Sequence, residues 1–174
     1  VVNKAGGIKV TRFGNSHVMF SEVSPSDGKI RKASEIPYLT KGKTIVFTNG
    51  CFDVFHAGHA DLLHYAKSKG DVLVVGINTD ESVKMIKGDK RPVNSLDMRT
   101  KVLSSISDVD YIVCFNTSTP EEIIKEIRPN VLIKGGDYTL DCIVGADFVQ
   151  SYGGKVETMP FHYNQSTTKI LAAL

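Results

Sequence analysis

Two histidines stand where an apolar run of the chain gives way to a helical pattern. His56 and His59 follow the run 44–47, which predicts a buried strand, and they precede apolar residues at helical spacing. In an α/β protein, ligands bind at this edge of the sheet, and the free N–H groups at a helix start favour phosphate. Gly58, which has no side chain, lets a phosphate approach the backbone closely. A lone histidine usually satisfies local hydrogen bonds only, but two around a glycine at this junction predict handling of a nucleotide's phosphates.

Two further polar groups follow later strands and therefore belong to the same edge of the predicted sheet. One is a Lys-Gly-Gly-Asp-Tyr run. The other is a Ser-Thr-Thr run at the start of the last predicted helix, where hydroxyls and free N–H groups together cradle phosphate. Each is an ordinary turn or helix cap when taken alone, but their convergence with the two histidines favours a binding site. The candidate residues in them are Lys134, Gly135, Asp137, Ser166, Thr167 and Thr168.

A basic, glycine-containing loop spans residues 87–93, and Arg99 follows it on the next predicted helix. Charged loops are usually just solvated. Here Lys87, Lys90, Arg91 and Arg99 could instead hold the phosphates of a sugar phosphate or a triphosphate. The chain has no GxxxxGK[ST], GxGxxG or GxSxG motif, which excludes the P-loop, the dinucleotide fingerprint and the nucleophile elbow.

A zinc site is the alternative use of the histidines. Cys51, His56, His59 and His64 are close in sequence and are all zinc-binding residue types. His59 and His64, however, are five residues apart on the predicted helix and point in different directions. The HExxH signature is also absent, so the sequence predicts no metal ligands in the protein.

Size and charge narrow the class of protein. The 174 residues suffice for one domain with a core and a small appendage. A formal net charge of +2 and the lack of a Lys/Arg block give no support to nucleic-acid or membrane partners, and no apolar run could span a bilayer. The three cysteines form no CxxC pair and are expected to be free thiols. With no visible signal peptide, we expect a cytoplasmic protein.

Strands and helices alternate from residue 43 onward. This predicts a Rossmann-like α/β fold, a doubly wound parallel sheet of about five strands with helices on both faces. Thr119 and Glu122 form the expected capping box of one of these helices. The strands are predicted at 44–47, 72–77, 111–115, 131–133 and 155–159. Helices are predicted at 80–86, 96–106, 119–128, 145–152 and 167–174.

The chain is expected to divide into three parts. Residues 1–24 hold two short predicted strands, 8–13 and 17–20, and form a separate piece. A turn-rich, polar stretch at 25–40 predicts a linker, and 41–174 forms the main domain.

The run from Thr48 to His59 resembles the signature of the HxGH nucleotidyltransferases, the cytidylyltransferase-like superfamily. Within it, residues 41–174 resemble the D-glycero-β-D-manno-heptose 1-phosphate adenylyltransferases, with the motifs in the same order and at similar spacing. This likeness implies the HxGH nucleotidyltransferase fold. The motifs that carry it lie at 48–53, 78–80, 87–93, Arg99, 109–111, 119–120, 134–138, 153–156 and 166–168.

Residues 3–14 resemble the tail of a ribokinase-like sugar kinase. In many bacteria a heptose 7-phosphate kinase is fused ahead of this transferase. The resemblance therefore implies the C-terminal half of a bifunctional kinase and adenylyltransferase. A strand pair unrelated to any kinase is the alternative for residues 1–24.

The resemblance implies that ATP and the heptose 1-phosphate give ADP-heptose, a precursor of lipopolysaccharide, and pyrophosphate. His56 and His59 would stabilise charge at the α-phosphorus, with Lys87 and Arg99 as further catalytic cations. The residues implied to bind the sugar phosphate are Asp80, Lys90 and Arg91. Those implied to bind the nucleotide are Asn49, Gly50, Cys51, Phe52, Asp53, His56, Gly58, His59, Lys134, Gly135, Asp137, Ser166, Thr167 and Thr168.

The same resemblance implies the cofactor and the partners. Mg²⁺ would come with ATP and be held largely by substrate and water. ATP and a sugar 1-phosphate would be the small-molecule partners, and relatives of this kind form homodimers.

Other functions fit parts of the pattern. Relatives that act on glycerol 3-phosphate carry an arginine-rich segment before the serine-threonine pair, where this chain has Phe-His-Tyr-Asn-Gln at 161–165. This difference argues for the heptose branch but leaves the base open. A cytidylyltransferase for a small alcohol phosphate and a guanylyl-transferring heptose enzyme are therefore alternatives. A nucleotide-binding regulatory module without catalysis and a purely structural domain are further alternatives.

Overall fold

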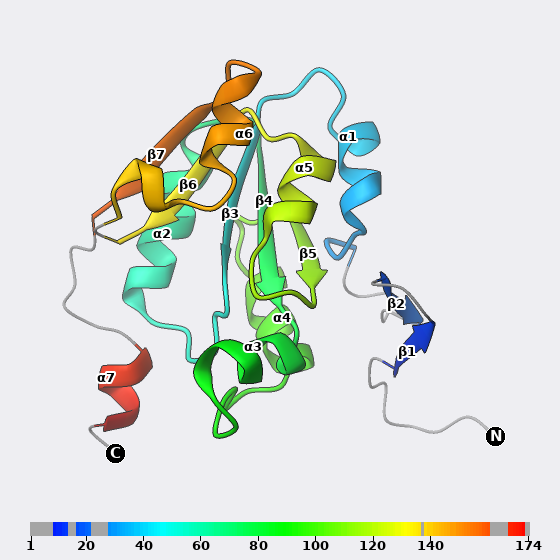
Figure 1. Cartoon of the computed structure of the whole chain (residues 1–174), viewed down its shortest axis with the longest axis vertical. Coiled ribbons are helices and arrows are strands. Elements are labelled where there is room, and N and C mark those ends of the chain that lie inside the picture. Colours follow the sequence, from blue (N-terminus) through cyan, green and yellow to red (C-terminus); the bar gives the residue numbers. More distant parts are fainter. Residues whose placement is uncertain (1–8, 14–16, 22–27, 137, 161–166, 173–174) are drawn as a thin grey trace.

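The structure is a computed structural model that describes residues 9–13, 17–21, 28–136, 138–160 and 167–172. Its described part holds a five-stranded sheet in which all strands run parallel, in the order β5-β4-β3-β6-β7 (Figure 1). The predicted α/β class and strand number are thus confirmed. The strands are β3 (Ile45–Gly50), β4 (Val72–Asn78), β5 (Tyr111–Phe115), β6 (Val131–Gly135) and β7 (Lys155–Met159).

The central strands form because their apolar runs are covered on both faces. All of β4 is buried, as is the first part of β3 and of β6. A strand buried on both faces needs a continuous apolar run rather than an alternating one, and the sequence supplies such runs. In the sheet, Thr48 pairs with Val75 of β4, and Phe47 pairs with Leu132 of β6.

Helices cover both faces of the sheet (Figure 1). One core contains apolar residues of α2 and α4, and the other contains residues of α1, α5 and α6. The predicted apolar face of α2 is confirmed, because Leu62, Leu63 and Ala66 are all buried. The helices are α1 (Ile36–Leu39), α2 (Ala57–Lys67), α3 (Asp80–Lys87), α4 (Leu96–Ser104), α5 (Glu121–Ile127), α6 (Ala146–Ser151) and α7 (Thr167–Ala172), with 3₁₀ turns η1 (Ala33–Glu35) and η2 (Leu140–Cys142).

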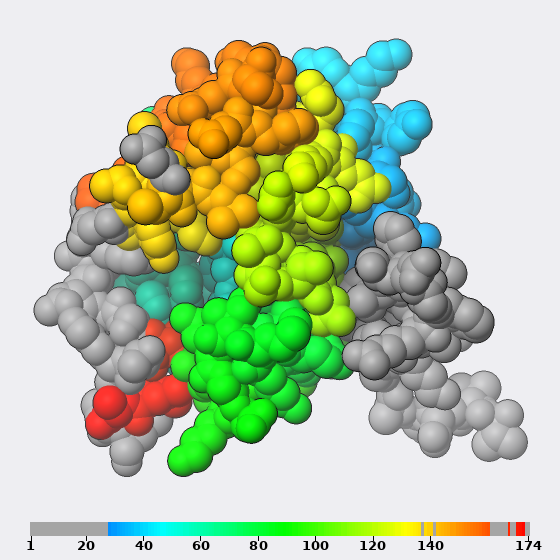
Figure 2. Space-filling model, in the orientation of Figure 1, coloured from blue at the N-terminus to red at the C-terminus, as the bar shows by residue number. Residues whose placement is uncertain are grey.

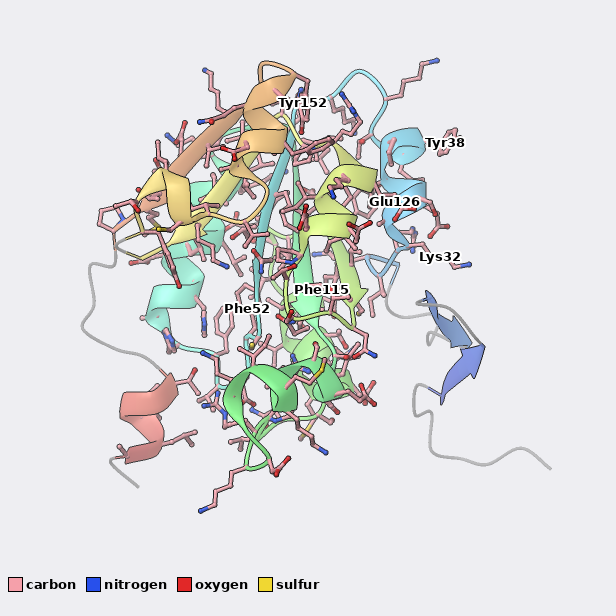
Figure 3. The ribbon with its side chains drawn as sticks, in the orientation of Figure 1. Lys32, Tyr38, Phe52, Phe115, Glu126 and Tyr152 are labelled. Carbon is pink, nitrogen blue, oxygen red and sulfur yellow. The ribbon has the colours of Figure 1, made fainter. Side chains whose placement is uncertain are left out.

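The strand order creates a point at which the chain reverses its direction across the sheet. From β3 the chain proceeds outward to β4 and β5, and it then returns to the other side of β3 to add β6 and β7. Connections therefore leave the carboxyl ends of β3 and β6 toward opposite faces, which opens a crevice where ligands bind in such sheets. Phe52 marks this end of β3 in Figure 3, while Tyr152 lies at the opposite end of the sheet.

Residues 28–40, which lie in the predicted linker, are packed against the sheet. Ile30 forms a parallel bridge with Ile112 of β5, and η1 and α1 bury Ala33 and Ile36 in the core of the α5 face. These apolar side chains make the segment part of the packed unit. The proposed division of the chain into domains stays a prediction.

The first segment contains the predicted strand pair. Strands β1 (Lys9–Phe13) and β2 (His17–Ser21) are antiparallel, with Thr11 opposite Met19. The strands are thus confirmed, and their kinship to a kinase tail remains a prediction.

The predicted capping box at the start of α5 is wrong. The helix begins at Glu121 with Pro120 as its N-cap, and no side chain caps it. Thr119 lies one position before the N-cap, so its hydroxyl is not at the position from which a side chain accepts the N–H groups of the first turn. Thr119 instead lines a cavity at the carboxyl edge of the sheet.

Candidate active site

The two histidines meet at the start of α2. His56 is the N-cap residue and His59 lies on the first turn, and their rings stack with centroids 3.8 Å apart. Phe52 packs against His59 with its ring centroid at 5.0 Å, and Phe55 does so at 5.5 Å. The first N–H groups of the helix point beyond its start, as they do in every α-helix, so the paired imidazoles flank a site suited to an anion.

A hydrogen bond sets the proton position on His59. The backbone N–H of His56 donates to Nδ1 of His59 at 3.4 Å. When the ring is neutral, its proton therefore resides on Nε2, which is left to donate to a ligand. In the described part, two buried side-chain polar atoms lack a hydrogen-bond partner, Thr48 Oγ1 near the end of β3 and His56 Nδ1 at the start of α2. Such exceptions are rare in folded proteins and here coincide with the candidate site.

Both histidines are held in the neutral form. Burial, and secondarily repulsion from His56, lowers the pKa of His59 to about 4. Burial also lowers the pKa of His56. At neutral pH the rings therefore act as hydrogen-bond donors rather than as fixed cations, until a bound anion favours their protonation.

This burial predicts a pH dependence of stability. The unfolded chain takes up a proton on His59 near pH 6.5, whereas the folded chain does so only near pH 4. The stability contribution of neutral His59 is therefore complete above pH 6.5 and is lost as pH falls toward 4, by about 3 kcal/mol. Urea unfolding across this range should show the loss. The variant His59→Asn keeps an acceptor but does not titrate, and it should flatten the curve; an unchanged slope would contradict the assignment.

The C-terminal helix contacts the loop that carries the histidines. The Thr167 hydroxyl, at the start of α7, donates to the carbonyl oxygen of Val54 at 3.3 Å. Val54 lies two positions before His56 in the chain. The contact therefore brings Thr167, one residue of the Ser-Thr-Thr run, close to the loop that carries His56. Ser166 lies outside the described residues, as does Asp137, and Thr168 is described only as part of α7.

A cavity of about 310 Å³ opens at the carboxyl ends of β3, β4 and β6. Figure 2 shows the surface hollowed between α3, in green, and the yellow-orange segment after β6. Five residues predicted from the sequence line this cavity, namely Asn49, Gly50, Cys51, Lys87 and Lys134. The lining residues that sequence reasoning did not select as site residues are Asn78, Ile86, Ser118, Thr119, Pro120, Tyr138, Cys142, Ile143 and Val144.

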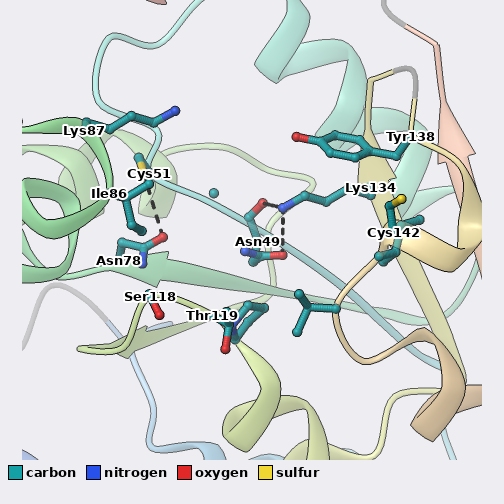
Figure 4. A pocket seen from close by; sticks show the side chains of 14 residues that line it. Asn49, Cys51, Asn78, Ile86, Lys87, Ser118, Thr119, Lys134, Tyr138 and Cys142 are labelled. Atoms are coloured by element: carbon teal, nitrogen blue, oxygen red, sulfur yellow. Dashed lines mark hydrogen bonds between the residues drawn. The ribbon is translucent and has the colours of Figure 1, made fainter.

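Lys134 and Asn49 form the centre of the cavity wall. The Lys134 ammonium donates to Asn49 Oδ1 at 3.1 Å and to the Asn49 carbonyl at 3.4 Å (Figure 4). Burial lowers the pKa of Lys134, with repulsion from Lys87 adding to the effect. Burial likewise raises the pKa of the Cys51 thiol despite the surrounding cations, so this thiol is neutral at neutral pH.

Asp53 links the loop between β3 and α2 to residues 91–94. Its carboxylate accepts the backbone N–H groups of Val93 and Asn94, each at 2.8 Å, and pairs with Arg91 Nε at 2.5 Å. Burial opposes the charge of Asp53, but these hydrogen bonds and the guanidinium lower its pKa overall. Asp53 and Arg91 thus form an ion pair with each other in this structure. Lys90, on the same loop, is exposed.

Arg99 is buried against the loop that follows β3. Its side chain is 0% exposed, and its guanidinium donates to the carbonyls of Cys51 at 2.6 Å and Asn94 at 3.0 Å and to Asp80 at 2.8 Å. Arg99 therefore anchors the loop after β3, and Asp80 is its ion-pair partner. The other predicted residue after β6, Gly135, ends the strand opposite Met159 of β7.

A helix start suited to an anion and a cavity lined by two lysines thus lie at one edge of the sheet. Fold and site together define a nucleotidyltransferase of the α/β type. The chain belongs to the cytidylyltransferase-like family, whose model matches residues 47–171.

Curated relatives of this chain carry two functions in one polypeptide, as their name says. The chain is 44% identical over 184 residues to the bifunctional protein HldE of Geobacter metallireducens, a match that covers 98% of this chain and 38% of that protein. It is also 44% identical over 183 residues to bifunctional protein HldE of Alcanivorax borkumensis, with the same coverage. The chain therefore spans well under half the length of these relatives.

Solved structures share the fold. The lipopolysaccharide core biosynthesis protein from Thermoplasma volcanium superposes with a TM-score of 0.56 at 24% identity, over 71% of this chain and 100% of that one. A pantoate-β-alanine ligase from Francisella tularensis, in complex with β-γ ATP and β-alanine, superposes with a TM-score of 0.56 at 18% identity, over 83% of this chain and 76% of that one. Among the described residues, no helix has the length and apolar character to cross a membrane.

Proposed function

We propose that the chain transfers AMP from ATP to D-glycero-β-D-manno-heptose 1-phosphate, releasing pyrophosphate and ADP-heptose. The observation that carries the proposal is the stacked pair His56 and His59 at the start of α2, beside a cavity that bears Lys87 and Lys134. The similarity to HldE proteins and the likeness to a lipopolysaccharide core biosynthesis protein support the sugar-nucleotide branch.

The acceptor is already an anion, so the reaction needs no strong general base. An oxygen of the sugar's phosphate attacks the α-phosphorus of ATP and forms the new P–O bond. The bond from the α-phosphorus to the bridging oxygen breaks, and pyrophosphate leaves with that electron pair. His59 Nε2–H and the amides at the start of α2 would donate to the phosphate oxygens as charge builds on them. Positioning and charge stabilisation thus supply the catalysis.

Mg²⁺ enters this proposal as part of the MgATP substrate. Among the described residues, no three His, Cys, Asp or Glu side chains are gathered to hold a metal ion. The nearby carboxylates are also engaged, Asp53 with Arg91 and Asp80 with Arg99. Oxygen ligands for the ion would therefore come largely from the triphosphate and water. As further proposals, a sugar kinase precedes this chain in the full-length protein, which the word bifunctional in the relatives' name supports, and the protein is a homodimer.

A nucleotide panel tests the function. We expect pyrophosphate release with ATP, Mg²⁺ and the heptose 1-phosphate, and loss of release when a chelator removes Mg²⁺. Release with CTP or GTP alone would overturn the adenylyl assignment, and release with CTP and glycerol 3-phosphate alone would favour the alcohol-phosphate alternative. If calorimetry shows that ATP binds but no product forms, the chain is a nucleotide-binding regulatory module. If no nucleotide binds, the structural-domain alternative is favoured.

A further inference from the structure

The cavity beside β3 carries two lysines without an anionic partner in the described part of the chain. Lys134 donates only to the two neutral oxygens of Asn49, at 3.1 and 3.4 Å. Lys87, at the end of α3, lines the same cavity and forms no ion pair with any described residue. Lys134 is half-buried, and an ammonium held there without a counter-ion is costly because the protein interior solvates charge poorly, whereas Lys87 is exposed. The cavity is therefore built to receive an anion.

The remaining lining suits a ligand with many hydroxyl groups. Ser118 and Thr119 add hydroxyl groups to the lining (Figure 4). The Asn78 amide already donates to Ser82 and Thr117, and Ile143 and Val144 make part of the lining apolar. A few placed polar groups in a partly apolar cavity are typical of small-molecule sites. A phosphorylated sugar needs both features, a cationic end for its phosphate and hydrogen-bonding partners for its hydroxyls.

The cavity lies on the opposite side of β3 from the histidines. Successive side chains of a strand alternate between faces, so Asn49 projects to the same face as Phe47, which packs in the core of α5 and α6. Helix α2, with His56 and His59, packs on the other face. An in-line transfer requires the attacking and leaving oxygens on opposite sides of the phosphorus. With pyrophosphate at the start of α2, the attacking phosphate comes from the cavity.

We infer that Lys134 and Lys87 bind the phosphate of the acceptor sugar, and that Lys134 is the residue that sets the requirement for a phosphorylated acceptor. This inference rests on the proposed function, because it assumes that a sugar phosphate is the second substrate. It moves Lys134 from the nucleotide site, where the sequence placed it, to the acceptor site. Asn49 positions the ammonium through its side-chain and backbone oxygens.

The variant Lys134→Met, with Lys134→Arg as its charge-conserving control, tests the inference. We expect Lys134→Met to raise KM for the heptose 1-phosphate by about 10- to 100-fold, the value of a charge-assisted hydrogen bond, and to leave KM for ATP unchanged. Lys134→Arg should restore much of the acceptor affinity. A raised KM for ATP with an unchanged KM for the acceptor would overturn the inference, and so would two unchanged values.

Calorimetry without nucleotide separates this inference from the proposed function. Wild-type protein should bind heptose 1-phosphate, and Lys134→Met should bind it at least about tenfold more weakly. Mannose 1-phosphate serves as a second probe. If no nucleotide supports transfer to the heptose 1-phosphate, the proposed function fails, yet Lys134-dependent binding of either sugar phosphate would still support the cavity assignment. Equal binding by wild type and Lys134→Met would overturn it. Thermal unfolding checks that the variant is folded.

The pH dependence of acceptor binding supplies a readout that a merely structural lysine would not move. A bound phosphate favours the charged ammonium, so affinity should fall as pH rises through the lowered pKa of Lys134. The other titratable side chains that line the cavity are Cys51, Lys87, Tyr138 and Cys142, and Lys134→Arg retains all four. Because arginine does not titrate in this range, the fall should be much weaker in Lys134→Arg. Equal pH profiles in wild type and Lys134→Arg would contradict the assignment.

Discussion

Replacing His59 with alanine should lower kcat for AMP transfer by on the order of a hundredfold or more. The imidazole is fixed by stacking on His56 at 3.8 Å and by the hydrogen bond from the His56 N–H to Nδ1, which leaves Nε2–H as a placed donor. A donor that is already in position costs no reorganisation when charge builds on the phosphate oxygens. Alanine removes this donor and also unstacks His56, so the loss should exceed that of an isolated hydrogen bond.

His64 provides the matched control for this substitution. It lies on the same helix, but its side chain is 80% exposed and pairs with Asp108 away from the site. We expect His64→Ala to keep the wild-type kcat in pyrophosphate-release assays. An unchanged kcat in a folded His59→Ala protein would show that the stacked pair does not act on the phosphates. A loss that appears in KM for ATP alone would assign His59 to ground-state binding instead.

The sheet could be predicted from sequence because its central strands are unbroken apolar runs. The run 72–77 has no polar residue and can only be buried, and the structure buries the whole of β4. The order of the strands was not predictable in the same way, because it depends on which faces the helices cover. The reversal between β3 and β6, which brings Asn49 and Lys134 together, links residues 85 positions apart.

The far side of the cavity illustrates what sequence patterns miss. Ile143 and Val144 lie in a segment with no helical or strand periodicity, so nothing local marks them as site residues. Thr119 is a residue type that often caps helices, and it precedes a predicted helix. This local pattern favoured a capping role over a position in the cavity wall. Asn78 carried a usable signal, because polar residues at the carboxyl end of a buried strand point to a binding edge.

Arg99 shows that sequence patterns also do not distinguish a buried cation from an exposed one. Sequence reasoning grouped it with Lys87 as a cation that draws in phosphates, since both are basic and close to one loop. The structure separates them, with Lys87 exposed at the cavity and the Arg99 side chain fully buried. A buried guanidinium with three acceptors holds the fold of a site, whereas an exposed cation is available to a ligand.

The variant Arg99→Met should therefore lower the free energy of unfolding by about 3 kcal/mol or more. Methionine fills part of the volume but leaves the carbonyls of Cys51 and Asn94 without their donor and Asp80 without its partner. Chemical denaturation of Arg99→Met and of Lys87→Met, compared with wild type, measures the difference. Lys87→Met should unfold within about 0.5 kcal/mol of wild type, because an exposed side chain stabilises little.

Activity alone would not distinguish the two roles, since a displaced Cys51 loop would also disturb Asn49 and the cavity. The decisive comparison is stability against substrate affinity. If Arg99→Met unfolds like wild type but binds ATP or the sugar phosphate weakly, Arg99 acts on a substrate and its buried position is not maintained in the complex. The expected result is that Arg99→Met lowers the free energy of unfolding and that Lys87→Met weakens only acceptor binding. In that case buried Arg99 holds the loop after β3 in place, and exposed Lys87 binds the ligand.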